Sequence, residues 1–430
     1  MDEDDEIWQH TAVNRASWDS IAVRRPPEPA AFFSAGGSTL DEIETDLLPD
    51  VAGRSMLHLG YRPSTRWWPP CPDQIRVRRS AGSAHTLMRV FPGPRYVDAT
   101  PVPADVSADP WDPAAARWRL DRLRDVLPIA LPAGTPFSGG ESNDVWIAGD
   151  SVLRVCWRGD RDRLLREAAV LAALPESVPH APVIGAGATE DVSWMLAERV
   201  PGRSLRAITE AVPQPQVRKL YAQLADILRS LHAWSPPEEI RTSLRERPAT
   251  VPGNLLSVWA TDLMPLPVER ALTMTELARS VPYLDPVLLN ATRARIEELA
   301  SSDPFADPGE STSVVHTDAA PGNVLVRNGE ISALLDFEWV RWGPPDHELV
   351  TLVRMSLPGL GPDVPILRWL EEDYPELFAH PDLDNRLWLS EIVYMLHGVI
   401  WWPPDHPEST LVPEHHVHTL RRLVQAPWPR

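Results

Sequence analysis

One histidine, two aspartates and one asparagine lie where their side chains could carry chemistry. His316, Asp318 and Asn323 fall within residues 314–326, and Asp336 follows thirteen residues after Asn323. Apolar residues flank the polar ones, which predicts a turn between two short strands with Asp336 at the end of the next strand. One carboxylate can deprotonate an attacking hydroxyl group, while an amide and a second carboxylate can hold magnesium against nucleotide phosphates. The set therefore predicts phosphoryl transfer.

Taken singly, each residue also fits an ordinary hairpin, because Asp, Asn and Gly are common in turns. The combined pattern is more specific. His-x-Asp-x-x-x-x-Asn followed by Asp-Phe resembles the catalytic and metal-binding segments of the aminoglycoside phosphotransferase family, over about residues 115–430. The resemblance implies that Asp318 is the catalytic base, that Asn323 and Asp336 are magnesium ligands, and that His316 supports the catalytic loop.

The same resemblance implies an α+β, protein-kinase-like fold of two lobes. A small β-rich N-lobe is expected over residues 114–200, and a helical C-lobe with the catalytic loop and acceptor site over residues 201–430. The implied activity transfers the γ-phosphoryl group of ATP or GTP to a hydroxyl group of a small molecule, with Mg2+ as cofactor. An aminoglycoside is the first candidate acceptor, which would give a role in antibiotic resistance. Residues 321–325, and Glu338 in place of the glycine of Asp-Phe-Gly, favour a small-molecule over a protein acceptor.

A glycine-rich loop precedes the predicted strands 145–148 and 151–157. Gly139, Gly140, Ser142 and Asn143 belong to it, and a glycine-rich turn lets backbone N–H groups approach phosphate oxygens. We therefore expect these residues to bind the nucleotide. Further along, helices are predicted over 161–174, 216–231 and 290–300.

Arg154 stands where the family resemblance implies a lysine. Glu167, on the predicted helix 161–174, is expected to pair with it. Arginine keeps the charge and binds phosphate in a bidentate manner, but its planar fork is larger than an ammonium group. Either Arg154 replaces lysine in a working kinase, or the chain is a nucleotide-binding pseudokinase or interaction protein with little turnover. The predicted strand 194–200 resembles the hinge between kinase lobes, where Glu198 and Val200 are expected to contact adenine through the backbone.

The acceptor site has two competing interpretations. An acidic pocket would attract a cationic aminoglycoside, whereas an aromatic surface would suit an apolar or glycosylated acceptor, or simply be core. The acidic candidates are Glu371, Glu372, Asp373, Glu391 and Asp405. The aromatic candidates are Trp388, Trp401 and Trp402. Four C-terminal histidines, of irregular spacing and without cysteine, favour a surface helix over a metal site: His406, His415, His416 and His418.

The first 113 residues differ from the remainder. Residues 13–19 and 50–60 resemble the opening of a class I S-adenosylmethionine-dependent methyltransferase, where a helix precedes a first strand and a glycine-rich turn. Arginine, tryptophan and proline then replace that turn, and a complete sheet would need several βαβ units of about 30 residues each. We interpret residues 1–60 as a truncated methyltransferase-like segment and 61–113 as an irregular Pro/Arg/Trp-rich linker. An active methyltransferase is the third alternative.

The charge balance excludes one class of partner. The 430 residues carry 41 lysines and arginines against 60 aspartates and glutamates, a formal net charge of −19. Nucleic-acid phosphates would be repelled, so no nucleic-acid partner is expected. The N-terminus lacks the basic and apolar regions of a signal peptide, and no run of about 18 apolar residues follows. We therefore expect a cytoplasmic protein without membrane contact.

Overall fold

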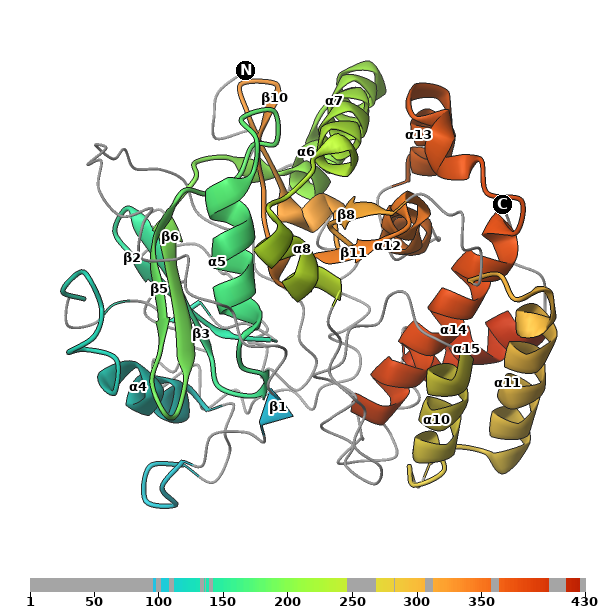
Figure 1. Cartoon of the computed structure of the whole chain (residues 1–430), viewed down its shortest axis with the longest axis horizontal. Coiled ribbons are helices and arrows are strands. Elements are labelled where there is room, and N and C mark those ends of the chain that lie inside the picture. Colours follow the sequence, from blue (N-terminus) through green and yellow to red (C-terminus); the bar gives the residue numbers. More distant parts are fainter. Residues whose placement is uncertain are drawn as a thin grey trace, which may run out of the picture. The chain divides into compact units, whose positions relative to one another are not determined.

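The computed structural model describes most of the chain beyond residue 112 and two short stretches before it (Figure 1). The described residues are 96–97, 102–107, 112–131, 135, 137–138, 142–245, 268–281, 283–305, 312–356, 363–401 and 415–425. All of them belong to one of the two units into which the chain divides, Pro70–Arg430. The methyltransferase-like segment 1–60 and most of the predicted linker 61–113 lie outside the described residues. Within that linker, β1 (Tyr96–Val97) pairs with β4 (Gly159–Asp160).

An antiparallel sheet of strand order β2-β3-β6-β5 forms the centre of the N-lobe (Figure 1). Its strands are β2 (Asp144–Ala148), β3 (Ser151–Cys156), β6 (Ser193–Glu198) and β5 (Val183–Ala188). Gly149 joins β2 to β3 at a φ of 60°, which suits a tight hairpin turn. The predicted hairpin and the predicted β-rich N-lobe are confirmed.

Alternation along β3 sends its side chains to opposite faces of the sheet. Leu153 and Val155 pack into a core with α4 (Pro113–Asp121). Arg154, between them, faces the other way and pairs with Glu167 of α5 (Arg163–Ala173). The pleat of the strand therefore directs Arg154 toward α5 rather than into the α4 core.

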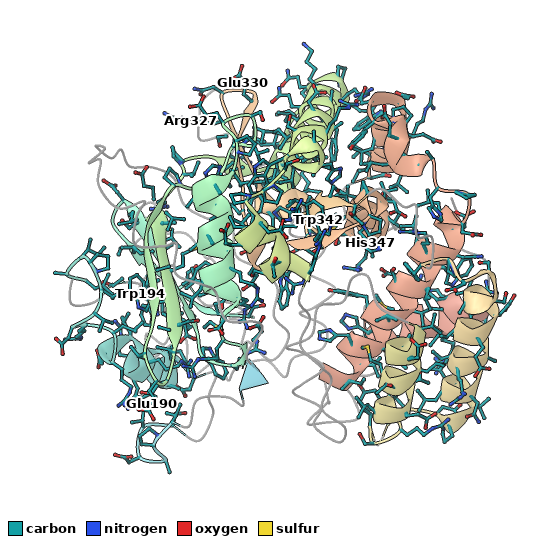
Figure 2. The ribbon with its side chains drawn as sticks, viewed as in Figure 1. Glu190, Trp194, Arg327, Glu330, Trp342 and His347 are labelled. Atoms are coloured by element: carbon teal, nitrogen blue, oxygen red, sulfur yellow. The ribbon has the colours of Figure 1, made fainter. Side chains whose placement is uncertain are left out.

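Trp194 of β6 requires small residues on the neighbouring strand (Figure 2). A Cβ atom at Gly187 of β5 would lie 2.9 Å from the Trp194 ring, and one at Gly185 would lie 3.5 Å from it. The glycines of β5 thus let the Trp194 indole pack closely against this strand.

The C-lobe is mainly helical, as predicted. Its helices are α6 (Leu205–Ala211), α7 (Gln214–Ala233), α8 (Glu238–Arg245), α10 (Val268–Ala278), α11 (Pro286–Leu299), α12 (Glu348–Met355), α13 (Ile366–Asp373), α14 (Leu383–Trp401) and α15 (His416–Gln425). Its short strands are β7 (Arg203–Ser204), β8 (Ser313–Val315), β9 (Val324–Arg327), β10 (Glu330–Leu334) and β11 (Arg341–Gly343). β9 lies between β10 and β7, and β8 pairs with β11. No described helix has both the length and the apolar character needed to cross a membrane.

A second hydrophobic core joins α10, α11, α14 and α15. Trp388 of α14 lies in it, only 5% exposed, and its indole N–H donates to the carbonyl of Leu423 at 3.1 Å. Of the two interpretations of this residue, the core interpretation is therefore correct, because a buried and hydrogen-bonded indole offers no surface to an acceptor.

The predicted surface position of the C-terminal histidines is wrong for the described ones. His415 is buried and His416 and His418 are half-buried, because α15 packs closely against α14. Gly398 of α14 permits this approach, since a Cβ atom there would collide with the His416 ring. His397 of α14 is also buried. His406 lies outside the described residues.

These histidines give the fold a predicted sensitivity to acid. Burial, which disfavours the charged form, lowers the pKa of His397 to about 3 and that of His416 to about 4. In the unfolded chain their pKa returns to about 6.5, so below that pH the unfolded state binds protons that the folded state does not. The contribution of these histidines to stability is therefore fully present above about pH 6.5. Below that pH, each histidine lowers the free energy of unfolding by about 1.4 kcal/mol per pH unit until the pH reaches its folded pKa.

Urea unfolding at several pH values between about 7 and 5 measures this effect. The slope of unfolding free energy against pH is expected to be smaller in His397→Gln than in the unsubstituted protein, since one titrating group is lost. Taking the difference between the two slopes removes the contributions of the titrating groups that both proteins share. Equal slopes would contradict the prediction.

Candidate active site

The turn between β8 and β9 brings Asp318 and Asn323 together. Residues Pro321–Asn323 form a short 3-10 turn that ends at β9. The Asn323 amide donates to Asp318 Oδ2 at 2.8 Å and to the Asp318 carbonyl at 3.0 Å. Both side chains are partly exposed, so a ligand can reach them. The amide fixes one carboxylate oxygen of Asp318 and leaves the other available.

His316 holds the loop from beneath and is buried. Its Nδ1 accepts from the Asp318 N–H at 3.2 Å, so Nε2 carries the proton that is donated to the Leu335 carbonyl at 2.9 Å. Burial lowers the pKa of His316, which favours this neutral form. The ring also packs edge-on against Phe337, with centroids 4.4 Å apart. The predicted supporting position of His316 agrees with these contacts.

Two residues of the site adopt left-handed backbone conformations without being glycine. Thr317 has a φ of 68° and Asp336 a φ of 64°, which costs an L residue about 1–2 kcal/mol. Hydrogen bonds hold Thr317 in place: its hydroxyl donates to the Trp339 carbonyl at 2.9 Å, and its own carbonyl accepts from Thr351 at 3.0 Å. Strain of this kind, held by surrounding contacts, is typical of functional loops.

The electrostatic surroundings of Asp318 favour a basic carboxylate. Burial, followed by the negative charge of nearby Asp336, raises the pKa of Asp318 to about 8, against which the Arg354 guanidinium acts. At this pKa the Asp318 carboxyl is mainly protonated at pH 7, and its ionised form increases as the pH rises toward 8. That ionised form accepts a proton more readily than an ordinary carboxylate. This environment suits a general base.

Asn323 and Asp336 offer oxygen ligands of the kind that magnesium prefers. The NH2 group of the Asn323 side chain is used by Asp318, so the side-chain oxygen Oδ1 of Asn323 remains for a cation. Asp336 uses Oδ1 for Arg154 at 2.9 Å, which leaves Oδ2. Among the described residues, no group of three or more His, Cys, Asp or Glu side chains is placed to hold a metal ion. A magnesium ion held by Asn323 and Asp336 would have to take its other ligands from nucleotide phosphates and water.

Arg154 and Glu167 form the ion pair that the sequence predicts. Arg154 Nη1 lies 2.7 Å from both carboxylate oxygens of Glu167, and the Phe337 N–H donates to Glu167 Oε1 at 3.1 Å. Burial raises the pKa of the Glu167 carboxyl, and the Arg154 charge opposes that rise. Lys219, the only lysine, is exposed on α7 and takes no part in this pair. The cation of the site is therefore an arginine.

The structure describes only some of the residues that are predicted to contact the nucleotide. Gly139 and Gly140 lie outside the described residues, whereas Ser142 and Asn143 directly precede β2. The Glu198 N–H donates to the Pro182 carbonyl at 2.8 Å, inside the N-lobe. Because that N–H group is already used, only the Glu198 carbonyl could make the expected backbone contact with adenine. Val200, the other expected contact, lies beyond the end of β6.

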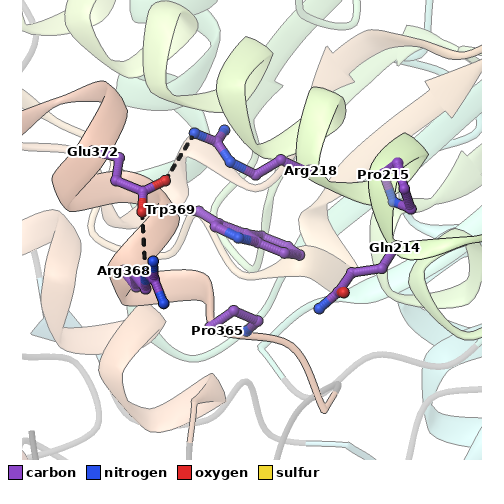
Figure 3. Close-up of a pocket in the computed structure, with 7 residues that line it drawn as sticks. All are labelled: Gln214, Pro215, Arg218, Pro365, Arg368, Trp369 and Glu372. Carbon is purple, nitrogen blue, oxygen red and sulfur yellow. Dashed lines mark hydrogen bonds and ion pairs between the residues drawn. The ribbon is translucent and has the colours of Figure 1, made fainter.

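Three of the acids that suggested a cationic acceptor are paired with arginines. Glu372 and Asp373 of α13 pair with Arg218 of α7, and Glu372 also pairs with Arg368 at 3.0 Å. Figure 3 shows Glu372 and both arginines around a pocket of about 410 Å3 that Trp369 also lines. This pocket lies between α7 and α13 and is separate from the catalytic loop.

Glu391 is also engaged in an ion pair, because Arg354 binds both of its carboxylate oxygens at 3.0–3.2 Å. Glu371 is exposed on α13. Asp405, Trp402 and the Trp401 side chain lie outside the described residues.

Sequence reasoning missed four residues that shape the site. Glu348 accepts the backbone N–H groups of His316 and Thr317, and Thr351, three residues later on α12, binds the Thr317 carbonyl. Polar residues spaced by three in an otherwise apolar helix were the available signal. Arg163 and Glu338 were missed as partners of each other, since 175 residues separate them.

Comparison with known proteins agrees with this architecture. Residues 133–380, more than half of the chain, match the model of the phosphotransferase enzyme family (APH). The structure is similar to that of aminoglycoside phosphotransferase APH(2'')-Ib with ADP bound, at 16% identity over 73% of this chain and 98% of that chain, with a TM-score of 0.50.

Two further solved structures give similar values. The GDP and kanamycin complex of APH(2")-IIia is 17% identical over 71% of this chain and 97% of that chain, with a TM-score of 0.50. A thermostable mutant of APH(4)-Ia with AMP-PNP and hygromycin B is 17% identical over 71% and 98%, with a TM-score of 0.50. At these identities the similarity shows the two-lobed, kinase-like fold. A comparison with curated proteins found no match.

Proposed function

The chain belongs to the phosphotransferase enzyme family, and we propose that it transfers the γ-phosphoryl group of ATP or GTP to a hydroxyl group of a small molecule. The observation that carries the proposal is the placement of three residues: the Asn323 amide binds Asp318, and the N–H of Leu335, next to Asp336, donates to the Asn323 backbone carbonyl at 2.8 Å. Arg154 binds Asp336. We assign residues 114–200 to the nucleotide-binding N-lobe and residues 201–430 to the C-lobe that carries the catalytic loop and the acceptor site.

Each residue has a distinct role in this proposal. Asp318 orients the acceptor hydroxyl and takes its proton, while Asn323 fixes the carboxylate and, with Asp336, provides oxygen ligands for magnesium. Magnesium, when bound, neutralises charge on the phosphates. Arg154 supplies a cation for the phosphates, held by Glu167. His316 keeps the loop in register.

Solved relatives support the choice of nucleotide and acceptor. The three structures named above contain ADP, GDP or AMP-PNP, and two of them contain kanamycin or hygromycin B. We take an aminoglycoside as the first acceptor to test, with antibiotic resistance as the corresponding role. Because Glu372, Asp373 and Glu391 pair with arginines, acceptors with fewer positive charges than an aminoglycoside, such as macrolides and nucleosides, belong in the same test.

One observation favours a second candidate, a nucleotide-binding pseudokinase. Arg154 lies 2.9 Å from Asp336 Oδ1, so only Oδ2 of this carboxylate is left for magnesium. If this pair persists when nucleotide is bound, turnover would be slow while nucleotide binding remains.

A coupled assay of ADP or GDP release, with magnesium and a panel of acceptors, tests the proposal. We expect acceptor-dependent release that a metal chelator abolishes. Asp336→Asn is expected to lose the magnesium-dependent part of nucleotide affinity, measured by calorimetry with and without magnesium, because an amide is a weaker cation ligand than a carboxylate. Nucleotide binding without turnover on any acceptor would favour the pseudokinase, and no nucleotide binding would exclude both.

A further inference from the structure

Two departures from the protein-kinase pattern meet in the folded chain. Arg154 stands where a lysine is implied, and Glu338 stands where kinases have the glycine of Asp-Phe-Gly. The structure places Arg154 Nη2 3.2 Å from Glu338 Oε2 and 2.9 Å from Asp336 Oδ1. The two substitutions are therefore neighbours in one ion-pair network.

Glu338 also binds the end of the loop that precedes β2. Its Oε2 atom accepts from the Asn143 amide at 2.7 Å and from Arg163 Nε at 2.9 Å. Arg163 Nη2 in turn donates to Asn143 Oδ1 at 2.9 Å and to the Ser142 carbonyl. Glu338, Asn143 and Arg163 are each at most 4% exposed. A single buried carboxylate thus joins the loop at 142–143 to the segment that carries Asp336.

Arginine is needed at position 154 to complete this arrangement. Its Nη1 faces Glu167 and its Nη2 faces Asp336 and Glu338, so one planar group bridges α5 and the Asp336 segment. A lysine ammonium is a single point charge and cannot present two separated nitrogens to these partners. A glycine at 338 would remove the carboxylate that accepts from Arg163 Nε and from the Asn143 amide, and leaving these two buried donors unpaired is costly.

We propose that Glu338 is a positioning residue for the nucleotide: it holds Arg154 and the loop at Ser142 and Asn143 in place relative to Asp336. Arg154 and Glu338 act as one coupled replacement of lysine and glycine. This inference rests on the proposed phosphotransferase function, because it assigns the nucleotide to the space between the loop and Asp336. It predicts that substitution of Glu338 changes the affinity for nucleotide and not the affinity for the acceptor.

The test is a double-substitution cycle with Glu338→Gln and Arg154→Lys, measured by calorimetric ADP binding without metal. Glu338→Gln is expected to weaken ADP binding about tenfold, since it removes the charge from two hydrogen bonds and from the ion pair with Arg154. The KM for nucleotide rises in parallel while the KM for acceptor stays the same. Arg154→Lys is expected to weaken binding strongly in the unsubstituted chain and much less when Glu338→Gln is already present.

Asp346→Asn is the matched control. Asp346 is a buried carboxylate paired with Arg386 at 2.7 Å in the C-lobe, so its loss should lower the stability to urea without changing ADP affinity. If Glu338→Gln loses only stability, as the control does, the inference is wrong. Additive effects in the double substitution would also overturn it. A parent chain that binds neither ADP nor GDP overturns the proposed function as well, so the two failures are distinguishable.

Discussion

Asp318→Asn is expected to lower kcat by about 10²–10⁴-fold, the contribution typical of a general base. The substitution keeps the size of the side chain, so the Asn323 amide can still donate to it as it does to Asp318 Oδ2. What disappears is the negative charge that accepts the hydroxyl proton. Nucleotide affinity should change little, because the cation and metal positions at Arg154 and Asp336 are untouched.

Steady-state kinetics and calorimetric nucleotide binding check this expectation together. Glu330→Gln is the control, since Glu330 is exposed at the start of β10. A variant at Asp318 that turns over as fast as the parent would remove it from the role of base. A parent that is itself as slow as the Asp318→Asn variant, with normal nucleotide binding, would identify the pseudokinase.

Arg119→Met is expected to destabilise the N-lobe by about 3–5 kcal/mol, because it leaves a buried carboxylate without its partner. Arg119 is fully buried and binds Asp144 through Nε at 2.6 Å and Nη2 at 2.8 Å. Its guanidinium also stacks on Trp157 at 4.2 Å. Burial already raises the pKa of Asp144, and Arg119 opposes that rise. The pair therefore fastens α4 to the first strand of the sheet.

Urea unfolding of three variants separates this effect from a general loss of arginine. Arg124→Met removes an ion pair with Asp121 that is exposed on both sides, so little change is expected. Adding Asp144→Asn to Arg119→Met removes the uncompensated charge and should recover part of the loss. Equal stability of Arg119→Met and Arg124→Met would contradict the prediction.

The local structure of the site follows from the sequence because its information is local. Alternating apolar residues specify β2 and β3, and helical periodicity specifies α5 and α7 close to their predicted ranges. Asp318 and Asn323 are five residues apart in one turn, so their hydrogen bond is a short-range consequence of the loop. The spacing of the motif was sufficient to predict the family.

The partners of charged residues were not predictable in the same way. From pattern and composition, Glu372 and Glu391 were equally good candidates for contacts with the acceptor, yet arginines on other helices bind both. The C-terminal histidines looked like surface residues, although His416 lies in the contact between α14 and α15. A sequence states a charge but not which segment will be packed against it.

The sequence by itself predicted the strands and helices around the site from periodicity, and it predicted the fold class and the set of Asp318, Asn323 and Asp336 from a motif that resembles a known family. Only the tertiary structure decided that Glu338 binds Asn143, 195 residues away, and joins Arg154 to the loop before β2. Burial decides such pairs. An ionised group removed from water must find a compensating partner, and packing of distant segments determines which one it finds.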